Sequence, residues 1–196
     1  MDVGFASEIR GTVLIVIFNR AEIRNPLSVP VLNRLSSILS DHVVLDGLKA
    51  IVFTGTGEAF ASGADLREIA EITPEMAREF AERGQSLMNL ISAAKPITIA
   101  AVNGYCFGGA LDLALACKHR IASPNAVFSH PGTSLGIITG WGGTQRLPRL
   151  IGQAGAMEMF FTAGRIDANE ALRTGLVDTI AEDVLEAALA MVSADS

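Results

Sequence analysis

Three short, strongly apolar segments constrain the fold of this chain more than any other feature of its sequence. They cover Val13–Phe18, Ala50–Thr54 and Ile97–Val102, and all three are rich in β-branched residues. Segments of this length and composition are typical of strands that are buried on both faces. Because patterns typical of helices separate them, the sequence predicts βα units and a largely parallel sheet, which is an α/β fold.

Helix signals occupy the intervening segments. A helix is expected over Ser28–Leu39 with Pro30 in its first turn, and Thr73 and Pro74 begin a long helix as its N-cap and first helical residue. Further elements are expected as short strands at Arg120–Ala122 and Leu176–Ile180 and as helices at Ala110–Cys117, Gly143–Leu150, Gln153–Phe161, residues 167–175 and Ala187–Val192. The sequence shows no internal repeat or linker, so residues 1–196 are expected to form a single domain.

Composition and charge argue against several classes of protein. Hydrophobic residues make up 49% of the chain and charged residues 18%, which argues against disorder. A formal net charge of −6 argues against a nucleic-acid partner. The two cysteines form no CxxC pair, the N-terminus has no basic signal-peptide start, and the early apolar run is too short to span a bilayer. We therefore expect a cytoplasmic protein with no membrane partner and no metal site.

Two glycine-rich turns form the candidate site. They cover residues 57–66 and 103–112, and each follows a buried strand and opens onto a helix. The first N–H groups of a helix lack internal acceptors, so two helix ends that face one point can bind an oxyanion. Small residues there let a thioester carbonyl approach the backbone closely. The alternative is that the glycines only cap helices and allow packing, an interpretation that is favoured for either turn alone.

Four blocks of the sequence resemble the enoyl-CoA hydratase/isomerase (crotonase) family, and they occur in the family's order. The blocks are NRAEIRNPLS at residues 19–28, AFASGADL at 59–66, AVNGYCFGGA at 101–110 and GGTQRL at 142–147. The resemblance covers essentially the whole chain and implies a crotonase-like spiral of ββα units. Because family members usually continue into further helices, the C-terminal helical region of this chain is expected to be short or missing.

The resemblance also implies a ligand and a set of site residues. The ligand is an acyl-CoA thioester, whose enolate oxygen would be bound by the N–H groups of Ala64 and Gly109. The adenine end of the coenzyme would lie near Ala61 and Ser62, and Arg67 either binds a coenzyme phosphate or is a solvated helix residue. No cofactor is implied beyond coenzyme A as part of the substrate. A homo-oligomer, either a trimer or a hexamer, is expected.

Two catalytic positions depart from the family pattern. Asp112 aligns with the first glutamate of family hydratases, and this shorter carboxylate in an apolar segment is expected to act as a general acid and base. Gly132 aligns with the second glutamate and has no side chain to move protons, so hydratase activity is expected to be weak. His130 either replaces the missing acid or is a solvated turn residue. The alternatives to hydration are isomerisation, a different crotonase reaction, and an acyl-CoA-binding protein with little activity.

A serine hydrolase is a further class that the sequence raises. Residues 132–136 match the nucleophile-elbow pattern G-x-S-x-G around Ser134. We reject this interpretation, because glycines follow where the elbow needs a helix and all three histidines precede Ser134.

Overall fold

Within the described residues, the main sheet has six strands, and five of them run parallel. The computed structural model describes residues 3–41 and 45–194. The strand order is β1 (Phe5–Arg10), β2 (Val13–Phe18), β4 (Ala50–Gly55), β7 (Ile97–Val102), β9 (His119–Ala122) and β12 (Thr179–Ile180). Only β1 is antiparallel to its neighbour; every other neighbouring pair in this sheet is parallel. The expected parallel sheet and its three apolar strands are therefore confirmed.

A second, smaller sheet repeats the order of the first. Its strands are β11 (Arg165–Asp167), β10 (Val127–Ser129), β8 (Tyr105–Phe107) and β5 (Ala59–Ala61), in that order. Each of the main strands β4, β7 and β9 is followed along the chain by one strand of the second sheet. A pair of two-residue strands, β3 (Pro26–Leu27) and β6 (Gly63–Ala64), completes the pattern. This repetition of paired strands followed by a helix is the ββα spiral that the resemblance implied.

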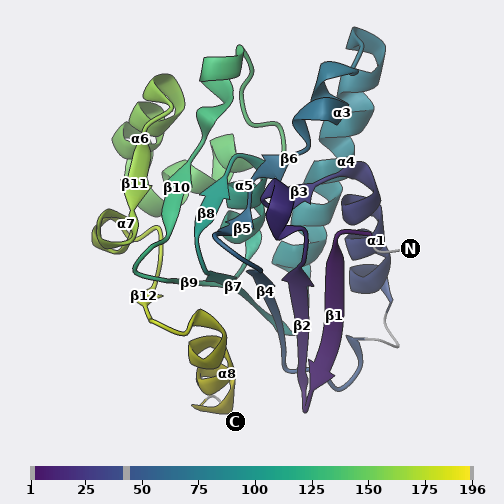
Figure 1. The fold of residues 1–196 in the computed structure, drawn as a ribbon, viewed down its shortest axis with the longest axis vertical. Coiled ribbons are helices and arrows are strands. Elements are labelled where there is room, and N and C mark those ends of the chain that lie inside the picture. The colour runs from purple at the N-terminus through teal and green to yellow at the C-terminus, as the bar shows by residue number, and fades with distance from the viewer. Residues whose placement is uncertain (1–2, 42–44, 195–196) are drawn as a thin grey trace.

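Helices cover both faces of the main sheet (Figure 1). The α-helices are α1 (Val29–Ser40), α3 (Leu66–Ala70), α4 (Pro74–Ala93), α5 (Gly109–Ala116), α6 (Gly143–Thr162), α7 (Ala168–Thr174) and α8 (Val184–Ala194), with 3-10 helices η1 (Ala21–Ile23) and η2 (Pro131–Leu135). The larger hydrophobic core lies between the sheet and α1, α4 and α5, and a smaller core lies between the opposite face and α8. Leu14 and Val16 point into the first core and Ile15 into the second, as the alternation of side chains along a strand requires.

Some element boundaries differ from the sequence-based expectation. The last strand is Thr179–Ile180 only, because the N–H groups of Leu176 and Val177 bind the carbonyl of Ala171 at the end of α7. Helix α8 begins at Val184 rather than at Ala187, because the Asp183 carboxylate accepts hydrogen bonds from the first backbone N–H groups. The two helices expected at 143–150 and 153–161 meet at Gly152, whose φ of 81° interrupts α6.

Helix α5 is the element that positions the candidate site. All of its residues after Gly109 are buried, and it packs against α4, α6 and β8. The Asp112 side chain is consequently held inside the protein. No helix in residues 3–41 or 45–194 is both long and apolar enough to cross a membrane.

Candidate active site

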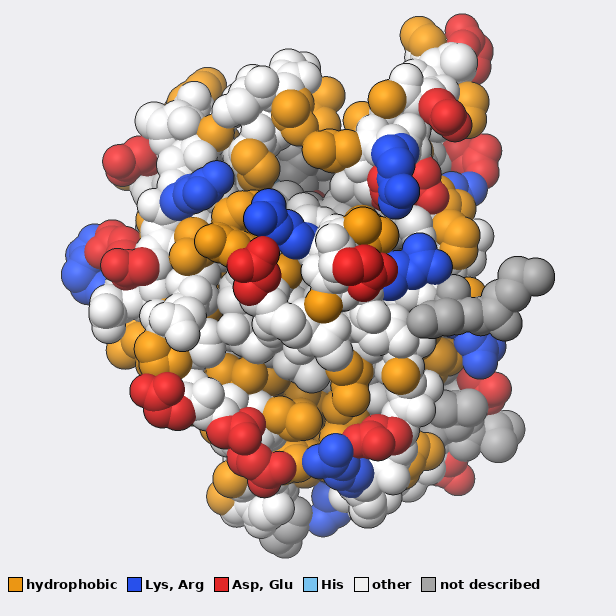
Figure 2. Space-filling model, viewed as in Figure 1, with side chains coloured by type: hydrophobic (Ala, Val, Ile, Leu, Met, Phe, Trp, Pro, Cys, Tyr) orange, Lys and Arg blue, Asp and Glu red, His pale blue; other side chains and the backbone are white. Residues whose placement is uncertain are grey.

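Two adjoining cavities open between α3 and η2; one extends toward α4 and α5, and the other toward β8 and β11. One has a volume of about 400 Å³ and the other about 620 Å³, and they share five lining residues, which are Ser62, Ala64, Leu66, Pro131 and Leu135. Figure 2 shows a hollow in the upper part of this face, between α3 and the turn that follows β10, with hydrophobic side chains around its rim. The two cavities thus form one continuous candidate site with two chambers.

The 400 Å³ chamber has mainly apolar walls with a small group of polar atoms. Its apolar lining includes Ile69, Ile72, Phe80, Ile137, Ile138 and Trp141. Backbone at Ala64 and Gly109 and the side chains of Asp112 and His130 complete the wall. An apolar pocket with a few converging polar groups is the usual form of a site that binds a small molecule.

The structure brings the two predicted oxyanion positions to the same chamber. Gly63 precedes Ala64 and has a φ of 95°, and a Cβ at Gly63 would lie 3.0 Å from the Gly109 nitrogen. Only glycine tolerates both this φ and this close approach. Gly109 is the first residue of α5, so its N–H is among the helix's first four, which have no intrahelical acceptor. The backbone at Ala64 therefore lies beside the N-terminus of α5.

Asp112 has an unusual electrostatic environment. Its side chain is 1% exposed, and the Thr139 hydroxyl donates a hydrogen bond to its Oδ2 atom. Burial raises the pKa of Asp112 to about 7, although the Thr139 hydrogen bond and the charge of Arg146 favour the ionised form. A carboxyl group with this pKa can both give and accept a proton near neutral pH.

His130 is buried, so its interpretation as a solvated turn residue is wrong. Its side chain is 2% exposed, and its ring lies 5.2 Å from the Phe160 ring, centroid to centroid. Burial lowers the pKa of His130 to about 4, which keeps the imidazole neutral at neutral pH. The Nε2 atom lies 3.6 Å from Oδ1 of Asp112, and both side chains line the 400 Å³ chamber.

Glycines make room for this arrangement. A Cβ on Gly143, at the start of α6, would collide with Oδ1 of Asp112, and a Cβ on Gly109 would collide with the Trp141 ring. Gly132 also lines the chamber, and a Cβ there would lie 2.9 Å from the carbonyl oxygen of Ile137. No side chain at position 132 reaches the chamber, as the sequence indicated.

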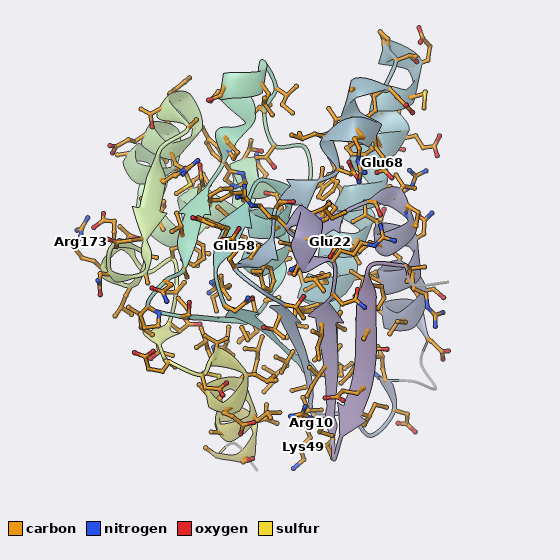
Figure 3. The ribbon with its side chains drawn as sticks, viewed as in Figure 1. Arg10, Glu22, Lys49, Glu58, Glu68 and Arg173 are labelled. Atoms are coloured by element: carbon orange, nitrogen blue, oxygen red, sulfur yellow. The ribbon has the colours of Figure 1, made fainter. Side chains whose placement is uncertain are left out.

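The 620 Å³ chamber is lined by cationic and aromatic side chains. Arg24 lies 5.9 Å from the Tyr105 ring centroid and Arg165 lies 5.4 Å from that of Phe107, and all four residues line the chamber. Glu58, labelled in Figure 3, pairs with Arg24 at 3.3 Å. The two arginines come from distant parts of the chain, so no local sequence pattern predicts that they meet here.

Of the remaining predicted site residues, two line a chamber and one does not. Ser62 lines both chambers, and Arg67 lines the larger one. Arg67 is 72% exposed and donates to both carboxylate oxygens of Asp65, at 3.0 and 2.7 Å, so it is solvated and also borders the chamber. Ala61 is fully buried in β5 and lines neither chamber.

Acidic residues near the site have structural partners. Asp65 caps α3 by accepting a hydrogen bond from the Arg67 N–H, and Glu68 accepts the N–H of Val29 at the start of α1 (Figure 3). Across the described ranges, no three histidine, cysteine, aspartate or glutamate side chains are grouped as metal ligands. Ser134 lies exposed in η2 and not at a strand-to-helix elbow.

Comparisons with known proteins agree on one family. Residues 8–194 match the family model described as enoyl-CoA hydratase/isomerase. The chain is 39% identical over 176 residues to a short-chain-enoyl-CoA hydratase of Clostridium acetobutylicum, covering 89% of this chain and 67% of that protein. It is 38% identical over 169 residues to a crotonyl-CoA hydratase of Syntrophomonas wolfei, covering 86% and 65%. The chain thus spans about two thirds of the length of these relatives.

Solved structures give the same result. The fold superposes on an enoyl-CoA hydratase from Bacillus anthracis with a TM-score of 0.91 and 35% identity, covering 97% of this chain and 75% of that one. It superposes on Pseudomonas aeruginosa DspI with a TM-score of 0.90 and 33% identity, covering 97% and 79%.

Proposed function

This chain belongs to the enoyl-CoA hydratase/isomerase family, and on that basis we propose that it binds an acyl-CoA thioester and stabilises its enolate. The observation that supports this most directly is the position of Ala64, Gly109 and Asp112 on one chamber. Two backbone N–H groups and one acid are the groups that enolate chemistry requires. The apolar walls suit the acyl chain, and the volume of about 400 Å³ lies in the usual range for small-molecule pockets.

The larger chamber suits the coenzyme. We propose that Arg24, Arg67 and Arg165 attract its phosphate groups, because guanidinium groups form strong charge-assisted hydrogen bonds with phosphate. Ser62 lines both chambers, which supports a contact between this residue and the bound acyl-CoA. The thioester carbonyl would then lie near the N-terminus of α5.

Isomerisation is the reaction that this set of residues supports best. Removal of a proton from the acyl chain places negative charge on the thioester oxygen, where the N–H groups of Ala64 and Gly109 would stabilise it. One carboxyl group can take a proton from one carbon and return it to another, with no net consumption of acid or base. Hydration additionally needs an activated water, and Gly132 has no side chain to activate it. A different crotonase reaction, or acyl-CoA binding with little turnover, is the alternative.

We also propose that the chain self-associates. Met157 and Phe161 on α6 and Leu172 on α7 are exposed to 52%, 74% and 43%, and exposed apolar side chains of this size favour association. Light scattering at micromolar concentration should show a trimer or hexamer, and a monomer would contradict the proposal. The cytoplasmic location, the single domain and the absence of further cofactors remain predictions from the sequence.

The experiment that tests the proposed function is a titration with a panel of acyl-CoAs, followed by turnover assays on those that bind. An enzyme of this family should change the enoyl absorbance of at least one unsaturated acyl-CoA. Binding without turnover would favour the binding-protein alternative. Hydrolysis of simple esters, or no acyl-CoA binding at all, would refute the proposal.

A further inference from the structure

We propose that His130 is the proton acceptor for Asp112: as Asp112 takes a proton from the substrate, its own proton passes to Nε2 of His130. The catalytic part of this proposal rests on the proposed function. The sharing of a proton between the two side chains can be tested without any substrate.

The geometry places one unpartnered oxygen opposite one unpartnered nitrogen. The Thr139 hydroxyl donates to Oδ2 of Asp112, and Oδ1 forms no hydrogen bond of normal geometry among residues 3–41 and 45–194, although the backbone N–H groups of Trp141 and Gly143 also favour the ionised carboxylate. Oδ1 is the atom that lies 3.6 Å from Nε2 of His130. This separation is longer than a hydrogen bond, but catalytic contacts often tighten only when substrate is bound.

The His130 ring has no competing partner in the described part of the chain. Neither Nδ1 nor Nε2 forms a hydrogen bond there, although the side chain is 2% exposed. A buried polar atom without a partner is uncommon in folded proteins and calls for an explanation. A role of His130 as the acceptor of the Asp112 proton is such an explanation. In the neutral ring with its hydrogen on Nδ1, Nε2 can accept that proton.

The charges of the pair explain why an acceptor is needed. Burial raises the pKa of Asp112 to about 7 and lowers that of His130 to about 4, so between these pH values both groups are neutral. A protonated Asp112 cannot act as a base until it has transferred its proton to another group. Of the other titratable groups, Arg146 of α6 attracts the Asp112 charge, and Cys106 of β8 is a buried thiol whose pKa is raised mainly by its burial. Neither is placed to accept the proton.

The proposed step conserves atoms and charge. The C–H bond of the substrate breaks and its electrons form the enolate, its proton binds Asp112, and the former Oδ1 proton binds Nε2 of His130. The products are an enolate, a neutral Asp112 and an imidazolium, whose positive charge offsets that of the enolate. The reverse transfers deliver a proton to the other carbon. His130 acts through Asp112 and is therefore a positioning residue.

The first test uses side-chain 15N NMR of the histidines in the free protein. The sequence contains three histidines, so spectra of His130→Gln and His119→Gln assign the signals. As Asp112 ionises near pH 7, Nε2 of His130 should change from a bare acceptor to a protonated donor, which gives an inflection without a change in ring charge. The inflection should be absent in Asp112→Asn. A His130 signal that shows no inflection between pH 5 and 9 in the unmodified protein would overturn the proposal.

The second test uses turnover as a function of pH. Below pH 7 the His130→Gln variant should lose about 10²-fold in kcat on the best acyl-CoA, the size of one acid–base contribution. Above pH 7 the loss should shrink, because Asp112 is already ionised and needs no acceptor. Acyl-CoA affinity should stay within about twofold, since the oxyanion donors are backbone groups. A defect of equal size at every pH would show a purely structural role and overturn the proposal.

A matched control lies elsewhere in the same chain. His119 also faces a carboxylate, with Nδ1 3.5 Å from Asp178, but it is partly exposed and lines neither chamber. His119→Gln should leave the pH profile unchanged. If no acyl-CoA is bound or turned over by any variant, the proposed function fails, and the NMR inflection alone still decides whether the two side chains share the proton.

Discussion

Oδ1 of Asp112 and Nε2 of His130 lie 3.6 Å apart, and neither side chain is more than 2% exposed. In the unfolded chain near pH 5, the aspartate is ionised and the histidine is charged, so the two together hold one proton. In the folded protein both are neutral, and they again hold one proton. Since the slope of stability with pH depends on the difference in bound protons, this pair adds almost no slope between pH 4 and 6.5. Changing either residue alone should reveal how the other residue makes stability depend on pH.

His130→Gln should make the protein less stable as pH rises from 4 to 7, relative to the unmodified chain. The folded pKa of Asp112 is raised from 3.8 to about 7, so its stabilising contribution is complete below pH 3.8 and is lost as pH rises through 7. The loss amounts to at most about 4 kcal/mol. Urea unfolding at several pH values measures it. A variant whose stability does not fall between pH 4 and 7 would show that Asp112 is not protonated in the folded state.

Asp112→Asn should produce the opposite slope. Only His130 then titrates, and its folded pKa is lowered from 6.5 to about 4, so stability is complete above pH 6.5 and falls as pH drops toward 4, by at most about 3 kcal/mol. The same substitution should reduce turnover by about 10²–10⁴-fold, because the amide cannot exchange a proton. The double variant, which lacks both titrating groups, is the control and should show neither slope. Wild-type turnover in Asp112→Asn would mean that Asp112 is only structural.

Gly109 and Trp141 must be changed together to test the oxyanion donor at Gly109. Gly109→Pro alone would combine loss of the N–H with a collision between Cβ and the Trp141 ring. In a Trp141→Leu background, Gly109→Ala keeps the N–H and Gly109→Pro removes it, and proline is tolerated as the first residue of a helix. We expect the proline variant to be about 10²–10³-fold slower in kcat than the alanine variant. Equal rates in two folded variants would refute the assignment.

The sequence was sufficient to predict five strands of the main sheet, but not its edge strand β1 and not the second sheet. Strands β2, β4 and β7 are buried on both faces, so each forms a continuous apolar run that local pattern reveals. Strands β5, β8 and β10 have only three residues each, too few to show any periodicity. Their pairing depends on the spiral as a whole, which only the resemblance to a family indicated.

The candidate site was predictable where backbone defines it and not where distant side chains meet. The glycine-rich turns pointed to Ala64 and Gly109, which do line one chamber. Thr139 was missed, because it meets Asp112 from 27 positions away in a loop without periodicity. The burial of His130 was missed because its neighbours Pro131 and Gly132 indicate an exposed turn, whereas the covering ring of Phe160 comes from α6.

The backbone around Gly132 determines whether a second acid can be restored there. Its φ lies outside the left-handed region, so the backbone itself accepts any residue. The obstacle is the Ile137 carbonyl, 2.9 Å from the position of a Cβ, which is held close by a hydrogen bond of 3.0 Å from the Ile137 N–H to the Gly132 carbonyl. Any side chain at position 132 must therefore move this turn slightly, and Gly132→Ala measures that cost without adding an acid.

We predict that the unmodified protein hydrates crotonyl-CoA about 10²–10⁴-fold more slowly than a family member with both glutamates, because one acid–base contribution is missing. Binding of acyl-CoA should persist, since backbone groups form the oxyanion site. Gly132→Glu should hydrate faster than Gly132→Ala, which shares its Cβ but has no carboxyl group, and Gly132→Gln should resemble the alanine variant. Enoyl absorbance measures all four proteins. Hydration by the unmodified protein as fast as its two-glutamate relative would show that another residue activates water, and His130, on the same chamber wall, would be the first to test.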